Sequence, residues 1–269
     1  MKKIVTFVFV SCIAWMGFSQ EAADKKFLAG ITIGGAVDFN IPQTTTIKAK
    51  PGGDFIAGMA LDWSFSKNVG LAGGIEFDFN SFKTTYNDSV YFSYNDKNIL
   101  RYKDMDGKDY ASFLLEERKA KSIYLSIPVM LKFQTNFMGY MRYYGKFGIR
   151  NSLLLSTRMD NQGIGYDKDG AVDNKNELKA MSSKGVMNFY KGSVGLAGGV
   201  EYNVSGTTTI VGEIGYYYGF TEIFQQKGAV FGDEEKAMSL YNYNKKGERE
   251  YYAPSLKQGQ LIFKIAVLF

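Results

Sequence analysis

The chain has 269 residues, and its 32 Lys and Arg against 27 Asp and Glu give a formal charge of +5, a balance that argues against a nucleic-acid partner. It contains no histidine, which excludes Ser-His and Asp-His catalytic mechanisms. With 30 Gly, 4 Pro and 16% aromatic residues, mostly Tyr and Phe, the composition favours pleated strands and tight turns, and so an all-β fold.

Residues 1–19 have the pattern of a secretory signal peptide. Lys2 and Lys3 form a positive start, an apolar run covers residues 4–18, and small residues end the segment. We expect cleavage before Gln20. The apolar run is shorter than the roughly 20 residues that a membrane-spanning helix needs.

The expected mature chain, residues 20–269, has no second apolar run of comparable length and a formal charge of +3 after loss of the two signal lysines. Cys12, the single cysteine, lies inside the signal. Disulfides, thiolate metal sites and cysteine nucleophiles are therefore not expected in the mature protein, and no cofactor is predicted.

Apolar residues then alternate with small or polar ones at a period of two, which predicts strands. The first four expected strands cover residues 27–39, 54–65, 69–80 and 121–134. Pro128 in the fourth suits a bulge or a bend, because proline cannot donate to a ladder.

Four more strands follow the same pattern. They cover residues 141–155, 190–204, 208–220 and 258–269. Ser205-Gly206 predicts a two-residue hairpin turn between two of them.

The expected strands are joined alternately by very short turns and by long polar segments near residues 84–119, 157–186 and 222–255. Strand-forming stretches at 90–94 and 110–115 predict that the first long segment protrudes as a hairpin. In outer-membrane barrels the short turns face the periplasm and the long loops face outside. The sequence therefore predicts an eight-stranded antiparallel up-and-down transmembrane β-barrel in the outer membrane of a Gram-negative cell, with both termini in the periplasm.

One face of each strand carries Leu, Ile, Val, Phe and Tyr, whereas the other carries Gly, Ala, Ser and charged residues. Only a narrow barrel interior suits the second face, so we expect the apolar face to meet lipid. Outward aromatic residues gather near the strand ends and predict two interfacial girdles. They are Trp63, Phe65, Phe133, Tyr143, Tyr202 and Phe269 at the periplasmic end, and Phe39, Phe79, Tyr218 and Phe220 at the other.

Three segments carry a resemblance to a known family. They are Tyr124–Phe133 (YLSIPVMLKF), Tyr144–Gly148 (YGKFG) and Gly195–Tyr202 (GLAGGVEY). With these the chain resembles the PorT-like family of outer-membrane β-barrel proteins, also labelled porin family or outer membrane protein beta-barrel domain. The resemblance spans most of the mature chain and implies a barrel fold and an outer-membrane location. One namesake is linked to type IX protein secretion, which makes an accessory role there an alternative, although no residue here carries that role over.

The inward face holds charges of both signs on neighbouring strands. The predicted lumen network is Glu76, Asp78, Lys132, Arg142, Lys146, Arg150, Glu201, Glu213 and Lys264. We expect Glu213 near Lys264, and Glu201 near Arg142 and Lys146, because ionised groups in a narrow lumen need partners. A plug of salt bridges is the preferred interpretation, and a narrow porin-like path for ions or small solutes is the alternative.

Two aspartate-rich stretches, Asp104–Asp109 and Asp167–Gly170 with Asp173, invite a calcium interpretation. Their spacing does not match an EF-hand, in which glycine takes position six and a later Glu is required. Asp-Gly is common at hairpin tips, so turns are the preferred prediction and weak calcium binding the alternative. No metal site and no enzymatic activity are predicted.

The long loops mix charges with tyrosine, as in Tyr241–Asn244 and Tyr251-Tyr252. Such loops either decorate a solvated surface or recognise proteins or glycans. The predicted function is therefore a structural or interaction barrel with a filled lumen and long extracellular loops. Its expected partners are outer-membrane lipid and lipopolysaccharide, the barrel assembly machinery during insertion, and an unknown extracellular or periplasmic protein.

Overall fold

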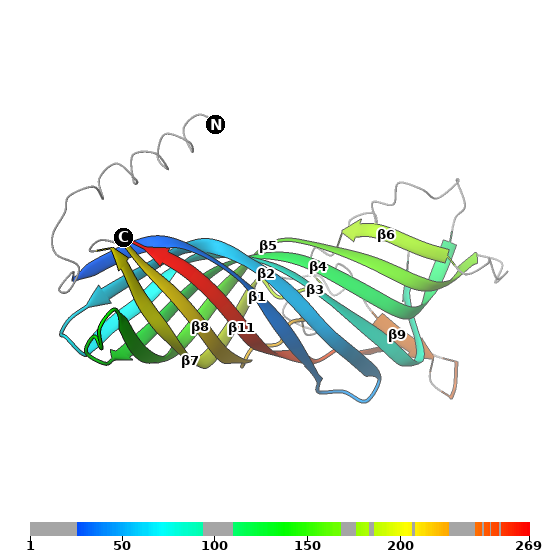
Figure 1. The fold of residues 1–269 in the computed structure, drawn as a ribbon. Coiled ribbons are helices and arrows are strands. Elements are labelled where there is room, and N and C mark those ends of the chain that lie inside the picture. The colour runs from blue at the N-terminus through cyan, green and yellow to red at the C-terminus, as the bar shows by residue number, and fades with distance from the viewer. Residues whose placement is uncertain are drawn as a thin grey trace.

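Eight long antiparallel strands form a closed ring in the computed structural model (Figure 1). Around the ring the order is β1-β2-β3-β4-β5-β7-β8-β11, and β11 pairs with β1. The structure describes residues 26–93, 110–167, 176–182, 186–205, 208–225, 240–243, 245–247, 249–252 and 254–269. The predicted eight-stranded up-and-down barrel is confirmed.

The ring strands match the eight predicted segments. They are β1 (Phe27–Pro42), β2 (Ile47–Ser64), β3 (Val69–Ser93), β4 (Tyr110–Gln134), β5 (Met141–Asp167), β7 (Tyr190–Ser205), β8 (Thr208–Gly219) and β11 (Leu256–Leu268). Three short strands extend this sheet outside the ring, β6 (Asn176–Ser182) on β5, and β9 (Leu240–Tyr243) with β10 (Arg249–Tyr252) on β3.

The first and last strands close the barrel. Their register runs without a shift from Gly30 opposite Leu268 to Pro42 opposite Leu256. Backbone hydrogen bonds in both directions between Ala29 and Phe269 extend the seam to the end of the chain. In hydrocarbon this closure gives the edge groups of β1 and β11 the partners that water cannot supply.

Three neighbouring strands are much longer than predicted. β3, β4 and β5 have 25, 25 and 27 residues and run well beyond the rest of the barrel at the end opposite the termini (Figure 1). The prediction of loops over 84–119 and 157–186 is therefore wrong where these strands continue. The predicted protruding hairpin is confirmed, since Val90 lies opposite Leu115 and Phe92 opposite Phe113.

Pro128 was predicted to lie at a bulge or a bend of its strand. The register of β3 and β4 is the same on both sides of this proline, so no bulge lies there, and pairing is only interrupted opposite Gly74 and Ile75. The register of β4 against β5 shifts at Tyr110/Ser112, at Leu115/Glu117 and at Ile123/Tyr124, and at the last of these β5 carries one extra residue. Gly206, the second residue of the predicted hairpin turn, lies outside the described residues.

The two faces of the barrel have the predicted chemistry. Outward side chains such as Ile31, Phe77, Leu196 and Ile265 are 44% to 69% exposed, whereas their inward neighbours are buried. Trp63, Phe65, Phe133, Tyr143 and Tyr202 lie exposed at one end of the strands, and Phe39, Phe79, Tyr218 and Phe220 at the other. Phe269, also predicted for the periplasmic end, is half-buried. A continuous apolar surface with aromatic rims suits contact with lipid.

No helix in the described part of the chain is long and apolar enough to cross a membrane. The expected signal peptide, residues 1–19, and its cleavage site before Gln20 lie outside the described residues, which begin at residue 26.

An outward charge should be costly at the middle of the apolar band and tolerated at its rim. We expect Leu196→Arg to lower the free energy of unfolding by about 2–4 kcal/mol, and Val204→Arg, near the periplasmic end of the same strand, by about 0–1 kcal/mol. Denaturant titration of the barrel in lipid vesicles measures both. Equal costs at the two positions would contradict the assignment of the lipid-facing band.

Candidate functional site in the barrel lumen

All nine predicted lumen residues lie inside the ring. Seven of them are 0% to 9% exposed. The side chains of Lys146 and Glu213 are 11% and 8% exposed. The alternation of the strands is the cause, because inward positions recur every second residue and a ring of eight strands leaves only a narrow interior.

The first group of contacts lies near the periplasmic end and links four strands. Lys132 on β4 forms ion pairs with Asp62 on β2 and with Glu201 on β7. Glu201 also accepts hydrogen bonds from Arg142 on β5, with 2.7 Å from Nε to Oε2. Lys132 is 1% exposed, so its ammonium group depends on these carboxylates in place of water.

A second group centres on Glu213 of β8. The Lys146 ammonium lies 2.5 Å from Glu213 Oε2, and the Tyr144 hydroxyl donates to the same oxygen at 2.7 Å. The Tyr144 ring fits because Gly199 has no side chain, and a Cβ there would lie 2.4 Å from the Tyr144 hydroxyl oxygen.

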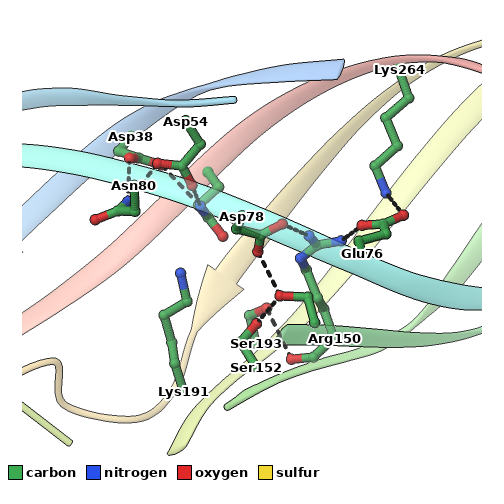
Figure 2. A network of polar contacts seen from close by, with 12 residues as sticks. Asp38, Asp54, Glu76, Asp78, Asn80, Arg150, Ser152, Lys191, Ser193 and Lys264 are labelled. Atoms are coloured by element: carbon green, nitrogen blue, oxygen red, sulfur yellow. Dashed lines mark hydrogen bonds and ion pairs between the residues drawn. The ribbon is translucent and has the colours of Figure 1, made fainter. Parts of the chain in front are cut away.

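Arg150 is the centre of a third group (Figure 2). Its guanidinium is fully buried and bridges Glu76 and Asp78 of β3, at 2.6 Å from Nη2 to Asp78 Oδ1. Lys264 of β11 reaches Glu76 at 2.6 Å. The Ser126 hydroxyl donates to Asp78 at 2.5 Å. This group ties together β3, β5 and β11, which are not neighbours in the ring.

The last group lies toward the extracellular side and contains two carboxylates, Asp38 and Asp54 (Figure 2). The Asn80 amide donates to Asp38 at 2.8 Å and to Asp54 at 2.5 Å. The Gln260 amide donates to the same two residues at 3.0 and 2.6 Å. The Lys191 ammonium, which is labelled in the same view, donates to Gln258 at 3.0 Å (Figure 2).

The predicted partnerships hold only in part. Glu213 lies opposite Lys264 in the ladder, as expected, but Lys264 pairs with Glu76 and Glu213 pairs with Lys146. Glu201 contacts Arg142, as expected, whereas Lys146 does not reach it. Side chains form contacts across the lumen as well as between paired residues of adjacent strands. The alternation pattern of the strands predicts only the contacts between adjacent strands.

Five buried charged residues of the interior were not among the predicted nine. They are Asp38, Asp54, Asp62, Arg118 and Lys191. The three aspartates and Lys191 lie on the inward face of predicted strands, the face with small and charged residues, so the period of two was sufficient to predict their direction. Arg118 stands in a segment predicted as loop, and no strand signal marked its direction.

The outer end of the interior is filled by apolar side chains. The buried cluster there is Phe82, Val90, Phe113, Leu115, Ala120, Tyr124, Met159, Leu178, Val186, Met187, Ile223, Phe224, Leu240 and Leu256. A cavity of about 50 Å³ remains farther in, lined by residues that include Asp62, Lys132 and Glu213. Its size and polarity suit a few water molecules.

No group of three or more metal-ligating side chains occurs within the residues that the structure describes. The stretch Asp104–Asp109 and residues 168–173 lie outside them, so the choice between turns and weak calcium binding stays a prediction.

Comparison with known proteins gives a family. The family described as Outer membrane protein beta-barrel domain matches residues 18–225. No curated protein matches the chain.

Several solved outer-membrane proteins are similar to the chain at low identity. The outer membrane protein OprG of Pseudomonas aeruginosa is 10% identical, with 93% of this chain and 96% of that one covered and a TM-score of 0.46. Ail, the attachment invasion locus protein of Yersinia pestis, is 12% identical over 91% and 100%, with a TM-score of 0.34. The outer membrane protease OmpT of Escherichia coli is 10% identical over 94% and 99%, with a TM-score of 0.37. Likenesses of this size give no information on substrate or partner.

Removal of the Arg150 guanidinium should leave buried Asp78 without its cation and Glu76 with Lys264 as its remaining ion-pair partner. We expect Arg150→Met to lower the free energy of unfolding by about 3–5 kcal/mol. Adding Asp78→Asn should restore at least about 1 kcal/mol, because Asp78 loses its charge while Ser126 can still donate to the amide oxygen. Denaturant titration of both variants in vesicles tests this, and a double variant less stable than Arg150→Met would refute the pairing.

Proposed function

Because the chain belongs to the family of the outer membrane protein beta-barrel domain and lies in the outer membrane, we propose that it is a closed, non-conducting barrel that anchors an extracellular interaction surface. The observation that carries the proposal is the neutralisation of the lumen charges by one another. The inner network has five cations and five carboxylates, namely Lys132, Arg142, Lys146, Arg150 and Lys264 with Asp62, Glu76, Asp78, Glu201 and Glu213.

Paired charges differ from the charged rings of a conducting pore. A pore ring attracts a mobile ion because its own charge is not compensated. Here each of the ten groups has a protein partner of opposite sign, and most are nearly inaccessible to solvent. A passing ion would have to displace a fixed partner from a narrow interior, which supports a plug.

The apolar cluster at the outer end supports the same proposal independently. Phe82, Phe113 and Phe224 are 0% to 2% exposed inside the extended part of the barrel. Ions cross such a stretch only if water fills it, and tightly packed aromatic side chains exclude water. The lumen thus has two barriers of different chemistry in series.

The extension of β3, β4 and β5 is the part best suited to an interaction role. It carries β6, β9 and β10 on its flanks and packs around the apolar cluster at the outer end of the interior, which supports its outer surface from within. A membrane plug alone does not need such a packed extension. A protein or glycan partner on the cell surface would explain it.

Catalysis is not part of the proposed function. The chain has no histidine to act as a general base. Glu76, Asp78 and Glu213 are held by cations or hydroxyl groups. Groups held in this way serve as counter-ions more readily than as acids or bases.

The finer assignment to the PorT-like family rests on the Tyr124–Phe133 segment, whose Lys132 is central to the lumen network. An accessory role in type IX secretion would follow from that assignment. A stable complex with secretion components after mild detergent extraction would favour it over an independent surface protein.

The closed lumen predicts electrical silence. We expect the mature chain in planar bilayers to show no discrete current steps over a range of salt concentrations. Glu213→Gln together with Lys264→Met should stay silent as well, because the apolar cluster at the outer end is untouched.

Incorporation of the barrel must be shown in the same bilayers, for example by heat-modifiable migration of the recovered protein. Stable ion-selective steps in the native chain, with a selectivity that changes on Glu213→Gln, would overturn the plug and establish a narrow channel with a charged lining.

A further inference from the structure

A strip of cations crosses the outward face of β2, β3, β4 and β5 just above the lipid-facing band. From this strip we infer a binding site for the phosphate groups of outer-leaflet lipid A. The cations are Lys48, Lys50, Lys83, Lys119, Lys121 and Arg158. Two carboxylates lie among them, Glu117 and Asp160.

The register places three of the lysines side by side. Lys50 lies opposite Lys83, and Lys83 lies opposite Lys119. Neighbouring strands are about 4.8 Å apart, and like charges directly opposite each other destabilise a sheet. An anion bound along this row would lower the repulsion between the lysines.

The side chains of the strip point away from the barrel. Their strand neighbours Phe82, Ala120 and Met159 are buried in the interior cluster, so the alternate positions face outward. The side chains of Lys50, Lys83 and Lys121 are 58%, 44% and 53% exposed. The ammonium groups are therefore accessible from the membrane side of the extension.

The strip stands at the height of lipid headgroups. Phe55, Phe79 and Ile123 form the last row of the apolar band on these strands. Lys83 follows Phe79 by four residues, which is about 13 Å along the strand and about 10 Å in height at a tilt of about 40°. In a Gram-negative outer leaflet the lipid A phosphates lie at this boundary between hydrocarbon and sugar.

The two carboxylates neutralise only part of the strip. Glu117 lies 2.8 Å from the Lys83 ammonium and 3.4 Å from that of Lys50, and Asp160 lies 2.8 Å from Lys121. Six cations against two anions leave an excess of positive charge on this face. Within the residues that the structure describes, Lys119 and Arg158 have no ion-pair partner.

Glu117 competes with an incoming phosphate for two of the lysines. Its hydrogen bond from Lys83 lowers its pKa below the usual value of 4.5, so it is ionised at neutral pH and holds the ammonium groups in place. Removal of this carboxylate should therefore raise phosphate affinity, whereas removal of the lysines should lower it. A purely structural strip would not give opposite effects.

The test uses the mature chain purified in a zwitterionic detergent and titrated with fluorescent bisphosphorylated lipid A. We expect Lys83→Gln, Lys119→Gln and Lys121→Gln together to weaken binding tenfold or more, since each cation near an anionic lipid surface contributes roughly a factor of five. Glu117→Gln should strengthen binding about twofold to fivefold. The matched control, Lys26→Gln, Lys67→Gln and Lys245→Gln, changes the net charge equally at distant exposed positions and should bind like the native chain.

The source of the phosphate is tested in the same assay. Dephosphorylated lipid A should bind at least tenfold more weakly than the bisphosphorylated form, and free inorganic phosphate at millimolar concentration should not displace the lipid. Equal binding of both lipids, full displacement by inorganic phosphate, or equal losses in the strip and control variants would each overturn the proposal. Heat-modifiable migration of every variant verifies that the barrel is folded.

Discussion

The constraint on which the structure depends is the closure of the strand ring between β1 and β11. A membrane core offers no water to an open strand edge, so each backbone donor and acceptor must find a partner within the sheet. With eight strands the ring closes, and its interior is then too narrow for anything except side chains. Glycine makes that filling possible at particular points. At Gly195 of β7 a Cβ would lie 2.3 Å from the Tyr217 ring. The absence of a side chain at Gly195 therefore leaves room for the aromatic side chain from β8.

Closure also determines how the interior charges must behave. Lys132, Arg150 and Glu76 are nearly inaccessible to water, and each would be costly without a partner. Their partners stand on strands that are not adjacent, as in the contacts from Arg150 to β3 and from Lys264 to the same Glu76. Buried ion pairs often add little net stability, but breaking one is expensive. The network therefore favours one relative placement of the strands over others that would bury the same apolar area.

The sequence was sufficient for the ring strands, their direction and the face that each turns inward, because lipid on one side and a narrow lumen on the other enforce a strict period of two. It was insufficient for the extension beyond Asn80. There both faces of the sheet leave the membrane, so outward Lys83 and inward Thr84 are both polar and the pattern fades. Contacts across the lumen could not be predicted from the sequence either. Glu213 and Lys264 are ladder neighbours, yet each pairs elsewhere, because tilt and side-chain length decide which groups meet.

The cations in the lumen are paired with carboxylates more completely than the cations of the outer strip. This difference gives the lumen cations a structural role and leaves the strip cations able to bind an anion. Arg150 has two carboxylates within contact and no route to solvent, so it can only hold the wall together. Lys83 shares one carboxylate with Lys50, and its side chain is 44% exposed at the height of the lipid headgroups. A change inside the lumen should therefore alter stability and leave lipid binding intact, whereas a change in the outer strip should do the reverse. The membrane-facing cations of the strip are thus available to a ligand in a way that the lumen cations are not.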